Sequence, residues 1–187
     1  MKIHRKHEKG RVSLTQLKAI STTLTPLQQR AIVGGVDINT IYLNGGGSAT
    51  SYNWGKEIGS YTVVTDASNN TYYFDGVSVS SGTKAPNGAA MQVGGVIYEG
   101  DNGINMNTFI HEYGHFLQQE TLNSKYPDWM ASVGYLGYIG GGSGIATLLS
   151  NLFPDYDYYS FPTEKEASEL GQAYMDYYYP DSNYIAP

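Results

Sequence analysis

His111-Glu112-Tyr113-Gly114-His115 lies in the second half of this 187-residue chain and carries its most specific chemical signal. In an α-helix, side chains at positions i and i+4 lie one above the other on the same face. His111 and His115 can therefore point both imidazoles at one metal ion, and the Glu112 carboxylate can reach a water molecule beside them. The pattern predicts a zinc site with two histidine ligands and a glutamate general base.

The residues around this motif predict the helix that it requires. Asn105, Asn107 and Thr108 are candidate N-caps just upstream. Apolar residues recur at helical spacing and would form a buried stripe: Phe109, Ile110, Tyr113, Phe116 and Leu117. Gly114 costs about 1 kcal/mol of helix stability against alanine, which indicates that something packs closely against it. The alternative is a surface helix that carries two unrelated histidines.

Charge is divided unevenly between the first 35 residues and the rest of the chain. Residues 1–35 contain seven lysines and arginines and one glutamate, whereas residues 36–187 contain four lysines, no arginine and sixteen acidic residues. The acidic body argues against nucleic acid as a partner, because phosphate contacts need clustered Lys and Arg. The chain has no cysteine, so a zinc ion would be held by His, Asp or Glu.

The basic stretch 1–35 ends in Gly34-Gly35, and Thr25-Pro26 predicts the start of a short helix before these glycines. The stretch resembles the double-glycine leaders that bacterial exporters cleave from peptide cargo. Gln28 and Gln29 depart from that pattern, which has an acidic and an apolar residue at these positions. The resemblance implies an exporter as a partner and an exported, extracellular protein. The alternative is a basic, flexible tail, which is also compatible with a cytoplasmic protein.

Residues 36–104 predict short strands separated by turns. Four segments are enriched in β-branched and aromatic residues: Ile38–Leu43, Tyr61–Thr65, Thr71–Phe74 and Val93–Tyr98. Asn69-Asn70 predicts a hairpin turn between the second and third segments. Gly45-Gly46-Gly47 and Pro86-Asn87-Gly88 predict loops.

The third zinc ligand is expected to be a carboxylate, because the other two histidines, His4 and His7, lie in the basic N-terminal stretch. A second helix is predicted to begin at Thr163. Glu164 lies on a face of this helix made of small and aromatic residues, which suits burial. Glu166 fits the N3 position of a capping box opened by Thr163. This leaves Glu164 as the candidate ligand, with Glu166 as the alternative.

The motif at 111–115, the following residues 116–119, a Gly-rich apolar linker and a Glu-x-x-Ala helix together resemble the gluzincins, the metallopeptidases that include thermolysin. The likeness is closest to short bacterial domains of that type and covers residues 94–178. It implies a zincin-like α+β fold, in which a small antiparallel or mixed sheet precedes the active-site helix and a second helix bears the ligand, here Glu164. The family carries Asp or Asn four residues after that ligand to orient an imidazole. This chain has Ser168 there, and a hydroxyl orients an imidazole more weakly than a carboxylate does.

The same resemblance implies two further parts of the site. An edge strand above the active-site helix binds substrate by strand addition, and the candidate residues are Gly95, Val96, Ile97 and Tyr98. The alternative is that they form an ordinary sheet strand. The family also stabilises the oxyanion with a downstream histidine or tyrosine. No histidine follows the motif here, so the candidates are the phenols of Tyr156, Tyr158 and Tyr159.

No charged residue occurs between Asp128 and Asp155. Within this run, Gly140–Gly144 predicts a loop and Ile145–Leu152 predicts a short buried helix. Residues 133–153 are long enough to span a bilayer, so membrane contact is an alternative role for the run. Their many glycines and small polar residues make them poorly hydrophobic for that role.

The sequence thus predicts an α+β, zincin-like domain over residues 36–187 that hydrolyses the peptide bonds of a peptide or protein substrate. His111, His115 and Glu164 would hold Zn²⁺, and Glu112 would deprotonate the attacking water. The alternative is a secreted binding or toxin-like module with a structural or non-catalytic zinc site. A fourth protein ligand would distinguish this module from an enzyme.

Overall fold

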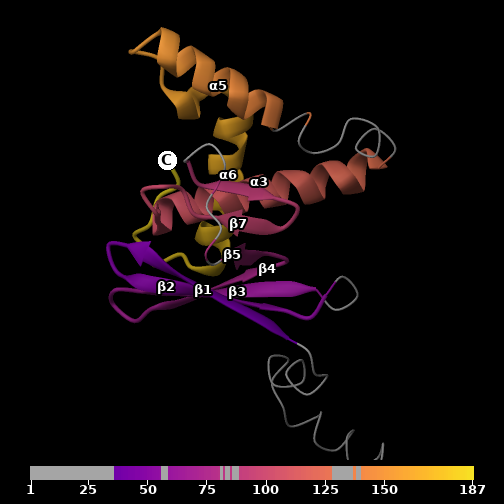
Figure 1. Ribbon diagram of the computed structural model, residues 1–187, viewed down its shortest axis with the longest axis vertical. Helices are drawn as coiled ribbons and strands as arrows, with labels where there is room; N and C mark the ends of the chain where they lie inside the picture. The colour runs from indigo at the N-terminus through magenta and orange to yellow at the C-terminus, as the bar shows by residue number, and fades with distance from the viewer. Residues whose placement is uncertain are drawn as a thin grey trace, which may run out of the picture. The chain divides into compact units, whose positions relative to one another are not determined.

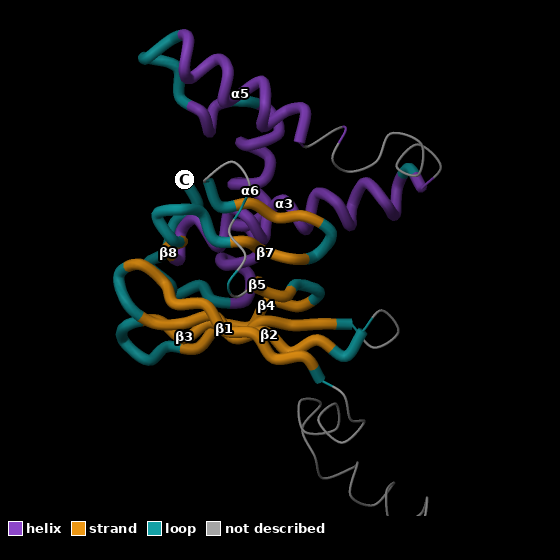
Figure 2. Tube along the Cα trace, in the orientation of Figure 1, coloured by secondary structure: helices purple, strands orange, loops and turns teal. Residues whose placement is uncertain are grey.

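The computed structural model describes residues 36–55, 59–80, 82, 85, 89–127, 137 and 140–187. In this part of the chain the strands come first and the long helices follow, which confirms the predicted α+β class (Figure 1, Figure 2). The predicted leader or tail at residues 1–35 lies outside the described residues. Export and recognition by an exporter therefore stay predictions.

A five-stranded mixed sheet forms the base of the fold. Its strands are β1 (Asp37–Asn44), β2 (Gly47–Asn53), β3 (Ser60–Asp66), β4 (Thr71–Asp75) and β8 (Ile104–Asn105), in the order β4-β3-β2-β1-β8. The first four strands pair antiparallel, and β8 pairs parallel to β1. The predicted turn between β3 and β4 is confirmed, and Asn69 adopts a positive φ of 63° in it. Gly47 was predicted as loop but begins β2.

A second, three-stranded sheet contains β5 (Ser78–Ser80), β6 (Met91–Val93) and β7 (Val96–Tyr98), in the order β5-β7-β6. The prediction of one strand over Val93–Tyr98 is wrong, because Gly94 and Gly95 turn the chain with φ of 59° and 80°. β6 and β7, on either side of these glycines, instead form an antiparallel hairpin. Within the described residues, β7 is paired on both sides, so the edge strands of this sheet are β5 and β6.

The helical part contains α3 (Met106–Lys125), α5 (Gly141–Leu152), the 3₁₀ turn η2 (Tyr158–Ser160) and α6 (Pro162–Tyr178). Of the predicted N-caps for α3, Asn105 takes the position, and its side chain accepts a 2.9 Å hydrogen bond from the backbone N–H of Thr108. The predicted capping box at Thr163 and Glu166 is wrong, since α6 begins at Pro162 and its N-cap is Phe161. Proline at the first turn of a helix is favourable, because its missing N–H would have no partner there.

Two glycines bring α3 and α6 into backbone contact. A Cβ added at Gly114 would overlap the carbonyl of Ala167, and one added at Gly171 would overlap the carbonyl of Ile110. The expectation that something packs closely against Gly114 is confirmed. Side chains of α3, including Phe109 and Ile110, fill the core against the first sheet.

Helix α5 lies on the side of α3 away from the five-stranded sheet (Figure 1). Contrary to prediction, Gly141–Gly144 belong to this helix rather than to a loop. The helix is also not buried, because Ile145, Leu148 and Leu152 are 51%, 56% and 62% exposed. Only Gly142 and Ala146 of this helix are buried. Among the described helices, none combines the length and apolarity needed to cross a bilayer.

Candidate metal centre

Helices α3 and α6 bring three predicted ligands together. The Nε2 atoms of His111 and His115 each lie 3.2 Å from the same carboxylate oxygen, Oε2 of Glu164. All three side chains are buried, and their ligand atoms lie within 4.8 Å of one another. The i,i+4 spacing on α3 aims both rings at one point, and the close contact of α3 with α6 supplies the carboxylate.

The hydrogen bonds of Ser168 determine which nitrogen of His111 faces the site. The Ser168 hydroxyl donates to the backbone carbonyl of Glu164 at 3.0 Å, so its oxygen accepts from Nδ1–H of His111 at 2.9 Å. This leaves the Nε2 lone pair of His111 directed at Glu164. Ser168 thus occupies the orienting position that the family resemblance implies, and it acts with a hydroxyl.

Gln118 orients the ring of His115 in the same way, and it is not among the site residues predicted from the sequence. Its Nε2 donates to the carbonyl of Thr163 at 2.9 Å and to the Glu166 carboxylate at 2.8 Å. Its Oε1 therefore accepts from Nδ1–H of His115 at 2.8 Å. The spacing i,i+3 from His115 was the available signal, since residues three apart are neighbours on a helix. Glu166 is engaged by Gln118 and does not belong to the three-ligand group.

The resulting donor set fits a divalent cation such as zinc. Two imidazole lone pairs and a carboxylate oxygen converge, and three acceptors at this separation need a cation or protons between them. Burial lowers the pKa of His111. Burial also lowers the pKa of His115, but Glu164 and Glu112 outweigh it and raise that pKa overall. Burial raises the pKa of Glu164, but protons shared with the two histidines in the metal-free protein outweigh this and lower the pKa overall.

The second oxygen of Glu164, Oε1, has hydrogen-bond partners of its own, and one of them lies on a third helix. The Ser143 hydroxyl of α5 donates to Oε1 at 2.5 Å, and the Thr163 hydroxyl donates to it at 3.4 Å. Tyr158 lies close to both groups, since Ser143 and Glu164 both influence the pKa of its phenol. These contacts hold Oε1 away from the histidines and leave Oε2 as the single ligand atom.

Glu112 is buried beside the ligands, at the edge of a cleft. Burial raises its pKa to about 7, and a hydrogen bond from the backbone N–H of Gln92 in β6 acts in the opposite direction. A carboxylate with a pKa near neutrality can take up a proton and release it again, as a general base must.

The cleft has a volume of about 350 Å³ and lies between α3, α5, η2 and the segment before β6. His111 and Glu112 line it from one side, and Tyr158 and Tyr159 line it from another. The rings of His111 and Tyr159 meet edge to face, with centroids 5.1 Å apart. Tyr156, the third candidate phenol, is not among the described residues that line the cleft.

The candidate substrate strand is placed differently from the prediction. Gly95 lies in the hairpin turn, and Val96, Ile97 and Tyr98 form β7, which has a partner on both sides. Strand addition there would require an existing pair to separate. The segment that adjoins the cleft is Ala89–Ala90, which leads into the edge strand β6.

Comparisons with known protein families, with characterised proteins and with solved structures found no match to this chain.

Proposed function

We propose that this protein is a zinc-dependent peptidase with a zincin-like fold, in which His111, His115 and Glu164 hold the metal. The observation that carries the proposal is the convergence of two imidazole lone pairs and one carboxylate oxygen, each oriented by its own hydrogen-bond partner. Two histidines and a glutamate are one of the ligand sets of catalytic zinc in peptidases.

A zinc ion bound there would supply Lewis acidity, activating water and polarising the scissile carbonyl. Glu112 would take the proton from the attacking water and pass it to the leaving amine, because it lies beside the ligands with a raised pKa. Tyr159 lines the cleft against His111 and would donate its phenol hydrogen bond to the developing oxyanion. Tyr158 instead lies close to Ser143 and Glu164 and would position the ligand carboxylate.

The substrate backbone would add to β6 (Met91–Val93) rather than to β7. β6 is one of the two edge strands of its sheet, and it is the one beside the cleft, because Ala89 and Ala90 before it line the cleft with Glu112. An extended peptide that pairs with an edge strand gains main-chain hydrogen bonds that are independent of sequence. This pairing would place the scissile bond near Glu112.

The alternative function, a binding module with a structural zinc site, requires a fourth protein ligand. Within the described residues, the potential metal-binding group contains three side chains from His, Cys, Asp or Glu. A set of three beside a cleft favours the enzyme, because the fourth position is left for water and substrate.

The decisive experiment combines metal analysis with hydrolysis of a fluorogenic peptide mixture. Wild type and Glu112→Gln are each expected to bind one zinc ion per chain, and only the wild type is expected to cleave. His115→Ala is expected to lose both the metal and the activity. Zinc binding without hydrolysis in the wild type would support the binding module, and equal hydrolysis by Glu112→Gln would refute the role of Glu112.

A further inference from the structure

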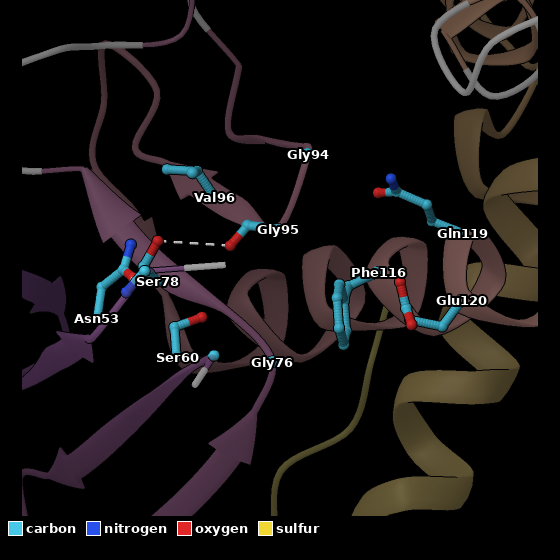
Figure 3. Close-up of a pocket in the computed structure, with 12 residues that line it drawn as sticks. Asn53, Ser60, Gly76, Ser78, Gly94, Gly95, Val96, Phe116, Gln119 and Glu120 are labelled. Carbon is cyan, nitrogen blue, oxygen red and sulfur yellow. Dashed lines mark hydrogen bonds between the residues drawn. The ribbon is translucent and has the colours of Figure 1, made fainter. Parts of the chain in front are cut away.

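A second hollow lies beside the C-terminal half of α3 (Figure 3). Its volume is about 510 Å³. On one side Gly76, Gly94 and Gly95 expose backbone, and all three have positive φ. On the other side stand Phe116 and Glu120 of α3. The Phe116 ring lies directly against Gly76, where a Cβ would overlap it. We refer to this hollow as the distal groove.

The distal groove and the cleft at the proposed metal centre are both lined by α3 and by residues that flank β6. On α3, Glu112 lines the cleft and Glu120 lines the groove. Along the other element, Ala90 before β6 lines the cleft, and Gly94 after β6 lines the groove. Eight residues of helix rise about 12 Å, and an extended peptide advances about 3.3 Å per residue. A substrate that follows β6 would therefore reach the groove about two to four residues from its scissile bond.

The direction of β6 indicates which part of the substrate reaches the groove. The chain of β6 runs from the cleft toward the groove, since Ala90 precedes the strand and Gly94 follows it. A peptide that pairs antiparallel with β6 runs the opposite way, from the groove to the cleft. Its residues over the groove would thus precede the scissile bond.

The chemistry of the groove suits a cationic side chain. Glu120 is exposed, and the half-buried Phe116 ring stands beside it (Figure 3). The described residues that line the groove include no lysine or arginine. A Lys or Arg side chain could lay its aliphatic stem on Phe116 and bring its charge to Glu120.

We infer that the distal groove is a specificity subsite for a lysine or arginine located two to four residues N-terminal to the scissile bond. The position of this basic residue relative to a scissile bond rests on the proposed peptidase function. The binding of a basic peptide side chain by Phe116 and Glu120 can be tested without hydrolysis.

The test uses the full chain with Glu112→Gln, loaded with zinc and immobilised, and a pool of synthetic peptides of equal length and random sequence. Retained peptides are counted by mass spectrometry. Peptides with Lys or Arg are expected to be enriched about fivefold over those without, the size expected for one partly exposed ion pair with a ring contact. Adding Glu120→Lys is expected to abolish this enrichment.

The matched control is Glu169→Lys, which makes the same change in net charge on the exposed face of α6, where Glu169 pairs with Lys165 at 3.7 Å. It is expected to keep the enrichment. Equal loss in both variants would show that the acidic body as a whole attracts basic peptides, and would overturn the subsite. No enrichment in the parent would also overturn it.

Mapping the bonds that the zinc-loaded wild type cleaves in the same pool tests the direction in which the substrate chain runs along β6. Basic residues are expected two to four positions before the cleaved bond, and enrichment only after that bond would overturn the antiparallel placement. If the wild type cleaves nothing, the proposed function fails, while the retention experiment still decides whether the groove binds a cationic side chain.

Discussion

The Ser143 hydroxyl donates a 2.5 Å hydrogen bond to Oε1 of Glu164, so α5 contributes to the proposed metal centre although it carries none of the three proposed ligands. A carboxylate held by one oxygen presents the other in a defined direction, which favours coordination through Oε2 alone. Helix α5 is itself held to α6 by a close approach, because a Cβ on Gly142 would overlap the Thr163 side chain.

Ser143→Ala is expected to lower zinc affinity by about 10- to 100-fold, the usual cost of removing a residue that orients a ligand. Competition with a chromophoric chelator measures this directly. Gly144→Ala is the matched control, because a Cβ there meets nothing within 4 Å and the neighbouring Ser143 is retained. Unchanged affinity in Ser143→Ala would show that Glu164 needs no support from α5.

Gly114→Ala is expected to lower the free energy of unfolding by about 1–3 kcal/mol, because the added methyl overlaps the Ala167 carbonyl and forces α3 and α6 apart. Helix propensity alone would predict the opposite, a gain of about 1 kcal/mol. Urea denaturation of the metal-free protein shows whether the substitution lowers or raises the free energy of unfolding. The same substitution at Gly144, which has open space, is expected to stabilise the protein, and equal gains at both sites would contradict the close contact.

Asp66 is expected to make stability depend on pH. It accepts hydrogen bonds from the backbone N–H groups of Ser68 and Asn70 and from the phenols of Tyr72 and Tyr184, so it anchors the C-terminal segment to the turn after β3. Burial raises the pKa of Asp66, but these hydrogen bonds outweigh it and the pKa lies below its ordinary value. The ionised group therefore stabilises the fold above its unfolded pKa of about 3.9, and this is lost as the pH falls through the folded pKa.

Asp66→Asn is accordingly expected to lower the free energy of unfolding by about 1–3 kcal/mol at neutral pH, with the difference from wild type shrinking as the pH falls from about 6 to 3. Urea denaturation at a series of pH values provides the measurement. A difference that stays constant over this range would contradict a lowered pKa for Asp66.

Tyr159→Phe is expected to lower kcat by about 100-fold while KM and zinc affinity stay close to wild type, because the phenol would act only in the transition state. Tyr158→Phe is expected to weaken zinc binding instead, since its phenol contacts Ser143 and Glu164. Steady-state kinetics on a cleaved peptide, with chelator competition for the metal, separates the two roles. Exchanged effects would assign the oxyanion donor to Tyr158.

Several features of the site were predictable because they depend only on neighbours along the chain. The i,i+4 spacing places His111 and His115 on one face of any helix, and the Asn105 cap fixes where that helix begins. The glycine between the two histidines signalled a close neighbour, although it could not say which one. Enrichment in β-branched and aromatic residues likewise identified β1, β3 and β4.

Contacts between distant segments were decided by the tertiary structure. Glu164 and His111 are 53 positions apart, and Glu164 rather than Glu166 meets the histidines because α6 begins at Pro162 and packs through Gly171 onto α3. Strand composition could not distinguish β6 from β7, since an edge strand is defined by which neighbours it lacks. The order of residues along the chain therefore determined the motif. The packing of the two helices determined which carboxylate meets the two histidines and which side chains orient them, and the second sheet determined which strand lies at an edge beside the cleft.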